Sequence, residues 1–194
     1  AYKVAKQGDV LMLFYLFDVD QVRALFRRLG YSLSKNTLKD NYEYYEKRTS
    51  HGSTLSKVVH CYVAHLIGKN RDAQNWFRGV LESDIYDSQG GTTGEGIHAG
   101  VMGGSIDIML RSFFGIHVYE DYIKIEPHIP GQWKSISTHF RYKRYSVWVK
   151  ITQKTATVIS RPDSKRKTKL LVEVNRKTRY LQAGKRSVFS LSGR

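Results

Sequence analysis

The sequence lacks the features that mark disulfide-bonded, secreted or membrane-spanning proteins. It holds a single cysteine in 194 residues, so no intrachain disulfide can form. Its longest apolar run, residues 10–17, is far too short to cross a bilayer, and no basic segment followed by an apolar one opens the chain. Cys61 stands in an apolar stretch, which predicts a buried structural thiol and not a nucleophile. We expect a reducing, cytoplasmic location and no membrane partner.

Acidic residues are scarce in the second part of the chain. Residues 1–114 carry 14 Lys and Arg against 12 Asp and Glu, whereas residues 115–194 carry 18 against 5. A basic module suggests a nucleic-acid or anionic-surface partner. Its densest run, residues 165–169, follows Arg161-Pro162-Asp163-Ser164, which is typical of a turn, so a solvated hairpin loop is the favoured interpretation. We therefore expect no nucleic-acid partner.

The first part of the chain has helical periodicity, and its 41% hydrophobic content predicts a packed core. Asp20 is placed to cap a helix whose apolar face holds Val22, Leu25, Phe26 and Leu29, and Gly30 is placed to end it. The same spacing recurs in residues 73–81. Residues 10–17 and 57–67 are apolar nearly all round, so their helices should be enclosed by others. Residues 97–114 predict a further inner helix, in which Gly100, Gly103 and Gly104 would let a ligand or another helix approach closely.

The period changes towards two after Gly115. Short β-branched or aromatic segments predict strands, which are separated by turn-forming residues; they are residues 118–125, 136–142, 145–152, 155–160, 169–174 and 186–191. Helices followed by strands indicate two segregated modules and not an alternating α/β sheet. The predicted fold class is an all-α part, residues 1–114, followed by a compact antiparallel β part, residues 115–194.

The most informative segment is Arg48-Thr49-Ser50-His51-Gly52-Ser53-Thr54-Leu55-Ser56, which we call the hydroxyl loop. It comes directly before an apolar helix. Ser and Thr commonly cap helix N-termini, and taken alone the loop is best explained as a cap. A helix N-terminus also offers free N–H groups and partial positive charge, so the same hydroxyls, glycine and basic residue could instead hold a phosphate.

Three other segments of the helical part are rich in polar chemistry: Ala5-Lys6-Gln7-Gly8-Asp9, Asn41-Tyr42-Glu43-Tyr44-Tyr45-Glu46, and the glycine-rich stretch from Gly90 to His98. Each has an ordinary explanation, as a surface ion pair, core aromatics or a tight turn. Together with the hydroxyl loop, they describe a polar pocket at one end of a helical barrel.

These segments resemble glycoside hydrolase family 65, which contains inverting maltose, kojibiose, nigerose and trehalose phosphorylases and some hydrolases. The resemblance is carried, in order and spacing over nearly all of residues 1–128, by Lys6-Gln7-Gly8-Asp9-Val10, Tyr44-Tyr45-Glu46, the hydroxyl loop and Glu95-Gly96-Ile97-His98. Residues 83–93 look most like the trehalose or kojibiose phosphorylase branch. The resemblance implies the C-terminal part of an (α/α)6 catalytic barrel in residues 1–114 and a small antiparallel β-sandwich module in residues 115–194.

The resemblance also implies roles for individual residues. Lys6 and Gln7 match the pair that contacts the glucosyl unit, while Ser53, Thr54 and His98 match the positions that bind inorganic phosphate. His51 and Glu95 are secondary candidates. Phosphate is the co-substrate, and neither a cofactor nor a metal is implied. Gly8 replaces the alanine that is usual in the family, a departure expected to matter little.

The family's general acid, a glutamate, lies on a barrel loop that would precede Ala1, and no acid in this chain matches its role. The 194 residues alone are therefore expected to be catalytically inert. The implied reaction converts an α-linked glucose disaccharide and phosphate to β-glucose 1-phosphate and a sugar. Because relatives in the family often form homodimers, the resemblance also implies a homodimer for the full-length protein.

Two alternatives remain open. The first is a family hydrolase acting on trehalose or kojibiose, because a hydrolase needs a carboxylate to activate water and Glu95 offers one. The second, from a different class, is a non-catalytic basic β-module that binds anionic partners. It requires the basic side chains of residues 115–194 to gather on one face.

Overall fold

A computed structural model describes residues 4–34, 36–86, 94, 96–163 and 169–191. The chain forms two compact units, Ala1–Ile108 and Met109–Arg194. Glu95 and residues 165–168 of the basic run lie outside the described residues, as do residues 90–93 of the glycine-rich stretch.

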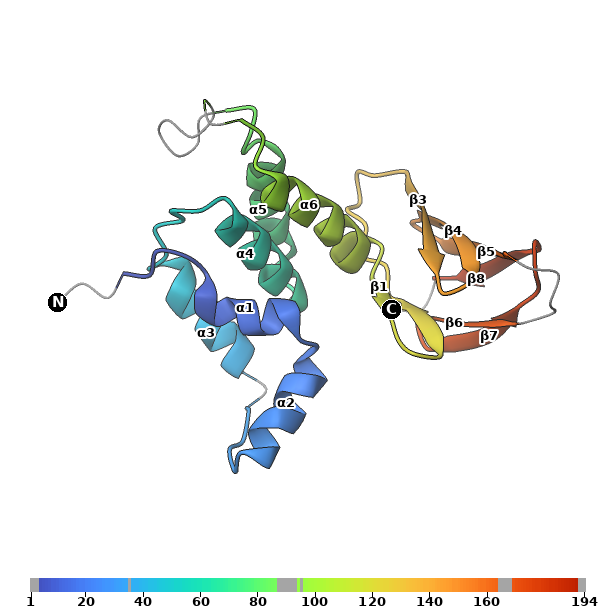
Figure 1. Ribbon diagram of the computed structural model, residues 1–194, viewed down its shortest axis with the longest axis horizontal. Coiled ribbons are helices and arrows are strands. Elements are labelled where there is room, and N and C mark those ends of the chain that lie inside the picture. Colours follow the sequence, from blue (N-terminus) through green and yellow to red (C-terminus); the bar gives the residue numbers. More distant parts are fainter. Residues whose placement is uncertain (1–3, 35, 87–93, 95, 164–168, 192–194) are drawn as a thin grey trace. The chain divides into compact units, whose positions relative to one another are not determined.

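The first unit is helical, as predicted. Its helices are α1 (Asp9–Leu16), α2 (Val19–Arg28), α3 (Thr37–Glu46), α4 (Leu55–Leu66), α5 (Asn70–Leu81) and α6 (Ala99–Ile108) (Figure 1). Helix α3 was not predicted, because its sequence TLKDNYEYYE is polar and aromatic and only Leu38 and Tyr42 are buried. Among the described residues, no helix combines the length and apolarity that crossing a membrane requires.

The start of α2 differs from the prediction. Asp18, not Asp20, caps the helix: its carboxylate accepts a hydrogen bond from the backbone N–H of Asp20, and Gln21 completes a capping box. Both aspartates fit the composition of a helix start, and only the backbone conformation distinguishes the cap from the first turn. Gly30 follows the helix with a φ of +81°, as expected for a residue that ends one.

Helix α4 is the centre of the first unit. It contacts α1, α3, α5 and α6, and nearly every side chain from Val58 to Ala64 is buried, so its predicted enclosure is confirmed. The Cys61 thiol is fully buried and donates to the carbonyl of Ala73 at 3.2 Å. Burial raises the thiol's pKa to about 12, which confirms the structural role predicted for Cys61.

The prediction of enclosure holds only in part for α1 and α6. In α1, Leu11 and Phe14 are buried, but Leu16 is 64% exposed. In α6, Val101 and Ile108 are buried and Ile106 is 63% exposed. The physical reason is that each helix contacts its described neighbours on one side.

The glycines of α6 permit a close approach of helices, as predicted. A Cβ on Gly104 would lie 2.7 Å from a γ-methyl of Val58, and a Cβ on Gly100 would lie 3.3 Å from the Leu55 side chain. The Leu55 and Val58 side chains of α4 therefore pack directly against the backbone of α6. Gly103 has no neighbour within 4 Å of such a Cβ, so its absent side chain is not explained by packing.

The second unit begins with a π-helical turn, η2 (Met109–Phe113), and continues as two four-stranded sheets. One sheet has the strand order β1-β2-β6-β7, formed by β1 (Ile116–Val118), β2 (Tyr122–Ile125), β6 (Leu170–Val174) and β7 (Lys177–Leu181). The other has the order β3-β4-β5-β8, formed by β3 (Ser135–Tyr142), β4 (Tyr145–Thr152), β5 (Thr155–Pro162) and β8 (Arg186–Ser190).

Three features of the sheets differ from the prediction. Residues 118–125 form parts of two strands, β1 and β2, which pair as a hairpin, because the polar Glu120 and Asp121 interrupt the apolar pattern. Strand β7 was not predicted, since four of its five residues are exposed. Strands β2 and β6 run parallel, so the module is not wholly antiparallel. A parallel pair needs a long connection, and in this chain the connection contains β3, β4 and β5 of the other sheet.

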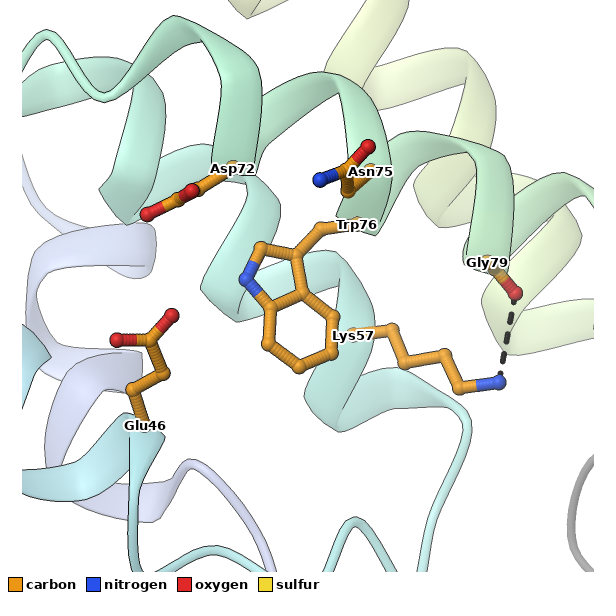
Figure 2. Close-up of a pocket in the computed structure, with 6 residues that line it drawn as sticks. All are labelled: Glu46, Lys57, Asp72, Asn75, Trp76 and Gly79. Atoms are coloured by element: carbon orange, nitrogen blue, oxygen red, sulfur yellow. Dashed lines mark hydrogen bonds between the residues drawn. The ribbon is translucent and has the colours of Figure 1, made fainter.

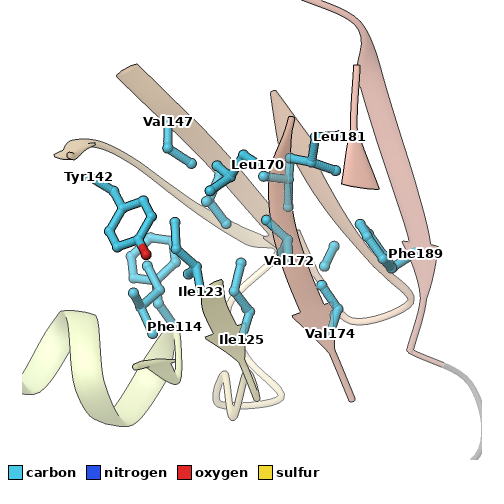
Figure 3. Close-up of a cluster of buried hydrophobic side chains, with 14 of the residues drawn as sticks. Phe114, Ile123, Ile125, Tyr142, Val147, Leu170, Val172, Val174, Leu181 and Phe189 are labelled. Atoms are coloured by element: carbon cyan, nitrogen blue, oxygen red, sulfur yellow. The ribbon is translucent and has the colours of Figure 1, made fainter. Parts of the chain in front are cut away.

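The two sheets share one hydrophobic core. Alternate residues of the strands of both sheets are buried in a single cluster that includes Val147, Phe189, Ile123 and Val172 (Figure 3). Side chains that alternate along these strands therefore point into the space between the two sheets.

Candidate functional site

The Lys6-Gln7 segment and the hydroxyl loop are joined by backbone hydrogen bonds. The N–H of Ala5 donates to the carbonyl of Arg48 at 2.9 Å, and the N–H of Ser50 donates to the carbonyl of Ala5 at 2.8 Å. The N–H of Gly52 then donates to the carbonyl of Lys6 at 3.0 Å. Two segments more than forty residues apart in the sequence thus lie side by side like a pair of short parallel strands.

Two glycines permit close contacts here, Gly52 with Lys6 and Gly8 with His60 of α4. A Cβ on Gly52 would lie 3.1 Å from Cγ of Lys6, so the lysine side chain passes directly over the loop backbone. A Cβ on Gly8 would lie 3.2 Å from Cε1 of the buried His60. The alanine usual at position 8 would therefore require this imidazole to move by a few tenths of an ångström, a larger consequence than the sequence suggested.

The hydroxyl loop ends at the start of α4 without acting as a side-chain cap. Thr54 is the N-terminal flanking residue of α4, and its side chain makes no capping hydrogen bond. Thr54 is 5% exposed, and Ser53 before it is partly exposed. The capping explanation therefore does not account for the Thr54 hydroxyl.

His98 is held by Asp84, a residue whose role was not predicted. One Asp84 carboxylate oxygen accepts the backbone N–H of His98 at 2.9 Å, and the other lies 2.6 Å from Nδ1 of its ring. This contact sets the orientation of the imidazole, as carboxylate partners do for functional histidines. The fourteen-residue separation of the two follows no helical or strand period, so the sequence carried no signal for the pair.

The starts of α4 and α6 lie side by side. Leu55, directly after Thr54, contacts Gly100, two residues after His98, and one turn further on Val58 contacts Gly104. The two helices therefore run in the same direction, with the Ser53-Thr54 and His98 segments at the same end. The partial positive charges of both N-termini add at this end, where they favour an anion.

His51 of the hydroxyl loop packs in an aromatic cluster with residues of α4 and α5. The rings of His51, His60 and Trp76 contact one another at centroid distances of 4.7 to 5.2 Å. His51 has a φ of +51°, an uncommon conformation for a non-glycine residue, and its Nδ1 lies 3.1 Å from the Ser56 hydroxyl. Burial, together with the neighbouring His60, lowers the pKa of His51 from 6.5 to about 4, and burial also lowers the pKa of His60.

These depressed pKa values predict acid sensitivity of the helical unit. Between pH 6.5 and 4 the unfolded chain takes up a proton at His51 that the folded chain resists, so the free energy of unfolding falls as the pH falls. Asparagine tolerates the positive φ, so His51→Asn is a suitable variant. Its free energy of unfolding should depend less steeply on pH, by at most about 1.4 kcal/mol per pH unit for one proton.

Urea unfolding followed by helical circular dichroism between about pH 7 and 4.5 measures this dependence. His139→Asn, which removes an exposed histidine of β3, should retain the steeper dependence. Equal slopes for His51→Asn and the unmodified chain would contradict the prediction.

Two family models match the chain. The glycosyl hydrolase family 65 central catalytic domain matches residues 1–107, and the family 65 C-terminal domain matches residues 116–179. The chain belongs to glycosyl hydrolase family 65. This confirms the family that the motifs indicated.

Similar proteins agree with the assignment to family 65. A trehalose 6-phosphate phosphorylase of Lactococcus lactis is 34% identical over 190 residues, which are 98% of this chain and 24% of that protein. An uncharacterised glycosyl hydrolase of Mycobacterium tuberculosis is 42% identical over 158 residues, or 81% of this chain and 12% of that protein. A solved structure from the human microbiome, described as a candidate kojibiose phosphorylase, superposes with a TM-score of 0.75 at 26% identity, covering 96% of this chain and 22% of that one. The family 65 chain thus spans no more than a quarter of these proteins.

Proposed function

We propose that this family 65 chain is the C-terminal part of an inverting α-glucoside phosphorylase of the trehalose or kojibiose type. The complete protein would convert an α-linked glucose disaccharide and phosphate to β-glucose 1-phosphate and a free sugar. The observation that carries the proposal is the pairing of two loops, one with Ser53 and Thr54 and one with His98, at the adjacent starts of the parallel helices α4 and α6. This arrangement supplies hydroxyls, an imidazole and helix N-termini to one anion.

The remaining site residues fit the same reaction. Lys6 and Gln7 would contact the glucosyl unit, and the backbone bonds between residues 5–6 and the hydroxyl loop would keep them beside a phosphate bound there. In an inverting reaction the nucleophile attacks opposite the leaving group, so a sugar site and a phosphate site must be neighbours. The acid that protonates the leaving oxygen would come from a loop upstream of these residues.

The state of Asp84 favours phosphorolysis over hydrolysis. A hydrolase needs a carboxylate to activate water, but both carboxylate oxygens of Asp84 are engaged by His98. Phosphate is itself a nucleophile and needs donors instead of a base. Glu95 lies outside the described residues, so the hydrolase alternative now depends on that glutamate.

The exposed apolar side chains of the first unit support a larger helical assembly. Leu16 on α1 is 64% exposed, Leu25 on α2 is 45% exposed, and Leu29, directly after α2, is 62% exposed. Apolar helix faces of this kind normally pack against other helices. We infer that they meet the other helices of an (α/α)6 barrel, with the β unit as its small C-terminal sandwich module.

Phosphate binding to the chain tests the proposal without requiring catalysis. We expect inorganic phosphate, titrated at about 0.15 M salt to screen the basic surface and followed by phosphorus NMR, to bind with a dissociation constant of about 1 mM. The double variant Ser53→Ala, Thr54→Val should weaken binding at least tenfold, because it removes both hydroxyls while conserving shape. Ser137→Ala, at an exposed position on β3, is the matched control and should bind normally. Equal affinity of the double variant and the control would refute the phosphate site.

A further inference from the structure

A pocket lies in the helical unit, and the proposed phosphate and glucosyl residues do not line it. Its volume is about 300 Å³, and it is lined by Glu46 at the end of α3, Lys57 in the first turn of α4, and Asp72, Asn75, Trp76 and Gly79 on α5 (Figure 2). Neither Lys6, Gln7, Ser53, Thr54 nor His98 contributes to its lining. The proposed reaction therefore gives this pocket no role.

Trp76 forms a rigid aromatic wall at the centre of the pocket. Its indole N–H donates to the hydroxyl of Tyr42 at 2.9 Å, and its ring packs on His51 and His60. The indole is thus fixed in one orientation while part of it remains accessible. A fixed aromatic surface costs little conformational entropy when a ligand binds, and its negative face attracts C–H groups that neighbouring oxygens polarise.

Hydrogen-bonding groups surround this wall on both sides. The carboxylates of Glu46 and Asp72 lie on one side of the indole, and the Asn75 amide lies near the point where the Trp76 side chain leaves α5 (Figure 2). On the other side the Lys57 ammonium donates to the Gly79 carbonyl at 3.4 Å. Carboxylates accept hydrogen bonds from hydroxyls, whereas an amide both donates and accepts.

The charges of the lining select a neutral ligand. Two ammonium groups balance the carboxylates of Glu46 and Asp72: Lys57 lines the pocket, and Nζ of Lys69 lies 3.8 Å from the Asp72 carboxylate. The pocket therefore has no uncompensated charge that would attract an anion or a cation. A ligand that offers many hydroxyls and an apolar ring face, but no charge, satisfies the indole, the carboxylates and the amide together.

We propose that the Trp76 pocket binds one ring of a neutral saccharide. Its volume is at the small end of ligand pockets, enough for a single hexose unit. The pocket would hold part of a sugar outside the reaction centre, with the ring face on Trp76 and hydroxyls on Asp72, Asn75 and Glu46. This site goes beyond the proposed phosphorolysis and does not depend on the phosphate site.

Fluorine NMR of the chain labelled with 5-fluorotryptophan tests the pocket. The sequence holds three tryptophans, at positions 76, 133 and 148, so one resonance reports the pocket and the others serve as internal controls. We expect glucose and α,α-trehalose to shift the Trp76 resonance saturably, with dissociation constants of about 1 to 10 mM, and to leave the Trp148 resonance unchanged.

Variants separate this site from the phosphate site. Asn75→Ala and Asp72→Asn should each weaken the sugar response at least fivefold, whereas Arg71→Ala, an exposed position on the same helix, should not. The double variant Ser53→Ala, Thr54→Val should leave the sugar response of the Trp76 resonance intact. A failure of the phosphate site can therefore be distinguished from a failure of the sugar site. Absence of a saturable Trp76 shift, or a tighter response to spermidine or to glucose 6-phosphate than to glucose, would overturn the proposal.

Discussion

Gly115→Ala is expected to destabilise the β-sheet unit more than an alanine substitution at any other described glycine of that unit. A Cβ at this position would lie 1.9 Å from the backbone oxygen of Glu126, closer than atoms can approach without moving the chain. Gly115 also has a φ of +63°, which alone costs an L-residue about 1–2 kcal/mol. Its carbonyl accepts the N–H of Glu126 at 2.9 Å, so relief of the clash would break the ladder between β1 and β2. We expect a loss of at least about 3 kcal/mol.

Gly184→Ala is the matched control. Gly184 has a similar φ of +72°, but a Cβ there meets nothing within 4 Å. It should cost only the conformational strain, about 1 kcal/mol. Urea unfolding followed by tryptophan fluorescence compares the two, because Trp133 and Trp148 both lie in the β-sheet unit. A Gly115→Ala chain as stable as Gly184→Ala would contradict the prediction, because it would show that the Gly115–Glu126 end of the β1–β2 pair moves apart without cost.

The second large loss of stability is expected for Gly104→Ala, at the contact between α4 and α6. An alanine Cβ would lie 2.7 and 2.9 Å from the two γ-methyls of Val58, and a valine in a helix has essentially one side-chain rotamer. The helices must therefore separate, at a cost of about 2–3 kcal/mol. Because their adjacent starts carry the Thr54 and His98 segments, phosphate binding should weaken as well.

Two further variants identify the cause of this effect. Gly103→Ala, one residue earlier and with nothing within 4 Å of its Cβ, should be neutral or stabilising by about 0.5–1 kcal/mol through helix propensity. Val58→Ala combined with Gly104→Ala should recover most of the lost stability, because it removes both clashing methyls. Circular dichroism of the helices during urea unfolding gives the stability of each variant and of the unmodified chain. Additive losses in the double variant would indicate that the contact is not the cause.

The sequence predicted most of the secondary structure for reasons that are local. The nearly all-apolar run of residues 57–67 and the helical spacing of residues 73–81 predicted α4 and α5, and the period of residues 145–152 predicted the bounds of β4 as observed. The predictions were wrong where several residues suit one role or where the pattern is absent. Asp18 and Asp20 both suit a helix cap, and the exposed strand β7 has no buried face to produce an alternation.

The family and the order of its two modules were determined by the sequence alone. The motifs around Lys6, the hydroxyl loop and His98 identify family 65 because they combine specific residue types at specific spacing. Periodicity separates helices from strands because burial of one face repeats about every 3.6 or every 2 residues.

Only the tertiary structure decided which segments come into contact within each unit. It paired Asp84 with His98, aligned the starts of α4 and α6 through Gly100 and Gly104, joined β2 to β6 in parallel, and formed the pocket at Trp76. Each of these contacts joins residues distant in sequence, and none repeats with a local period. Their geometry depends on packing between elements, which the order of residues within one element does not encode.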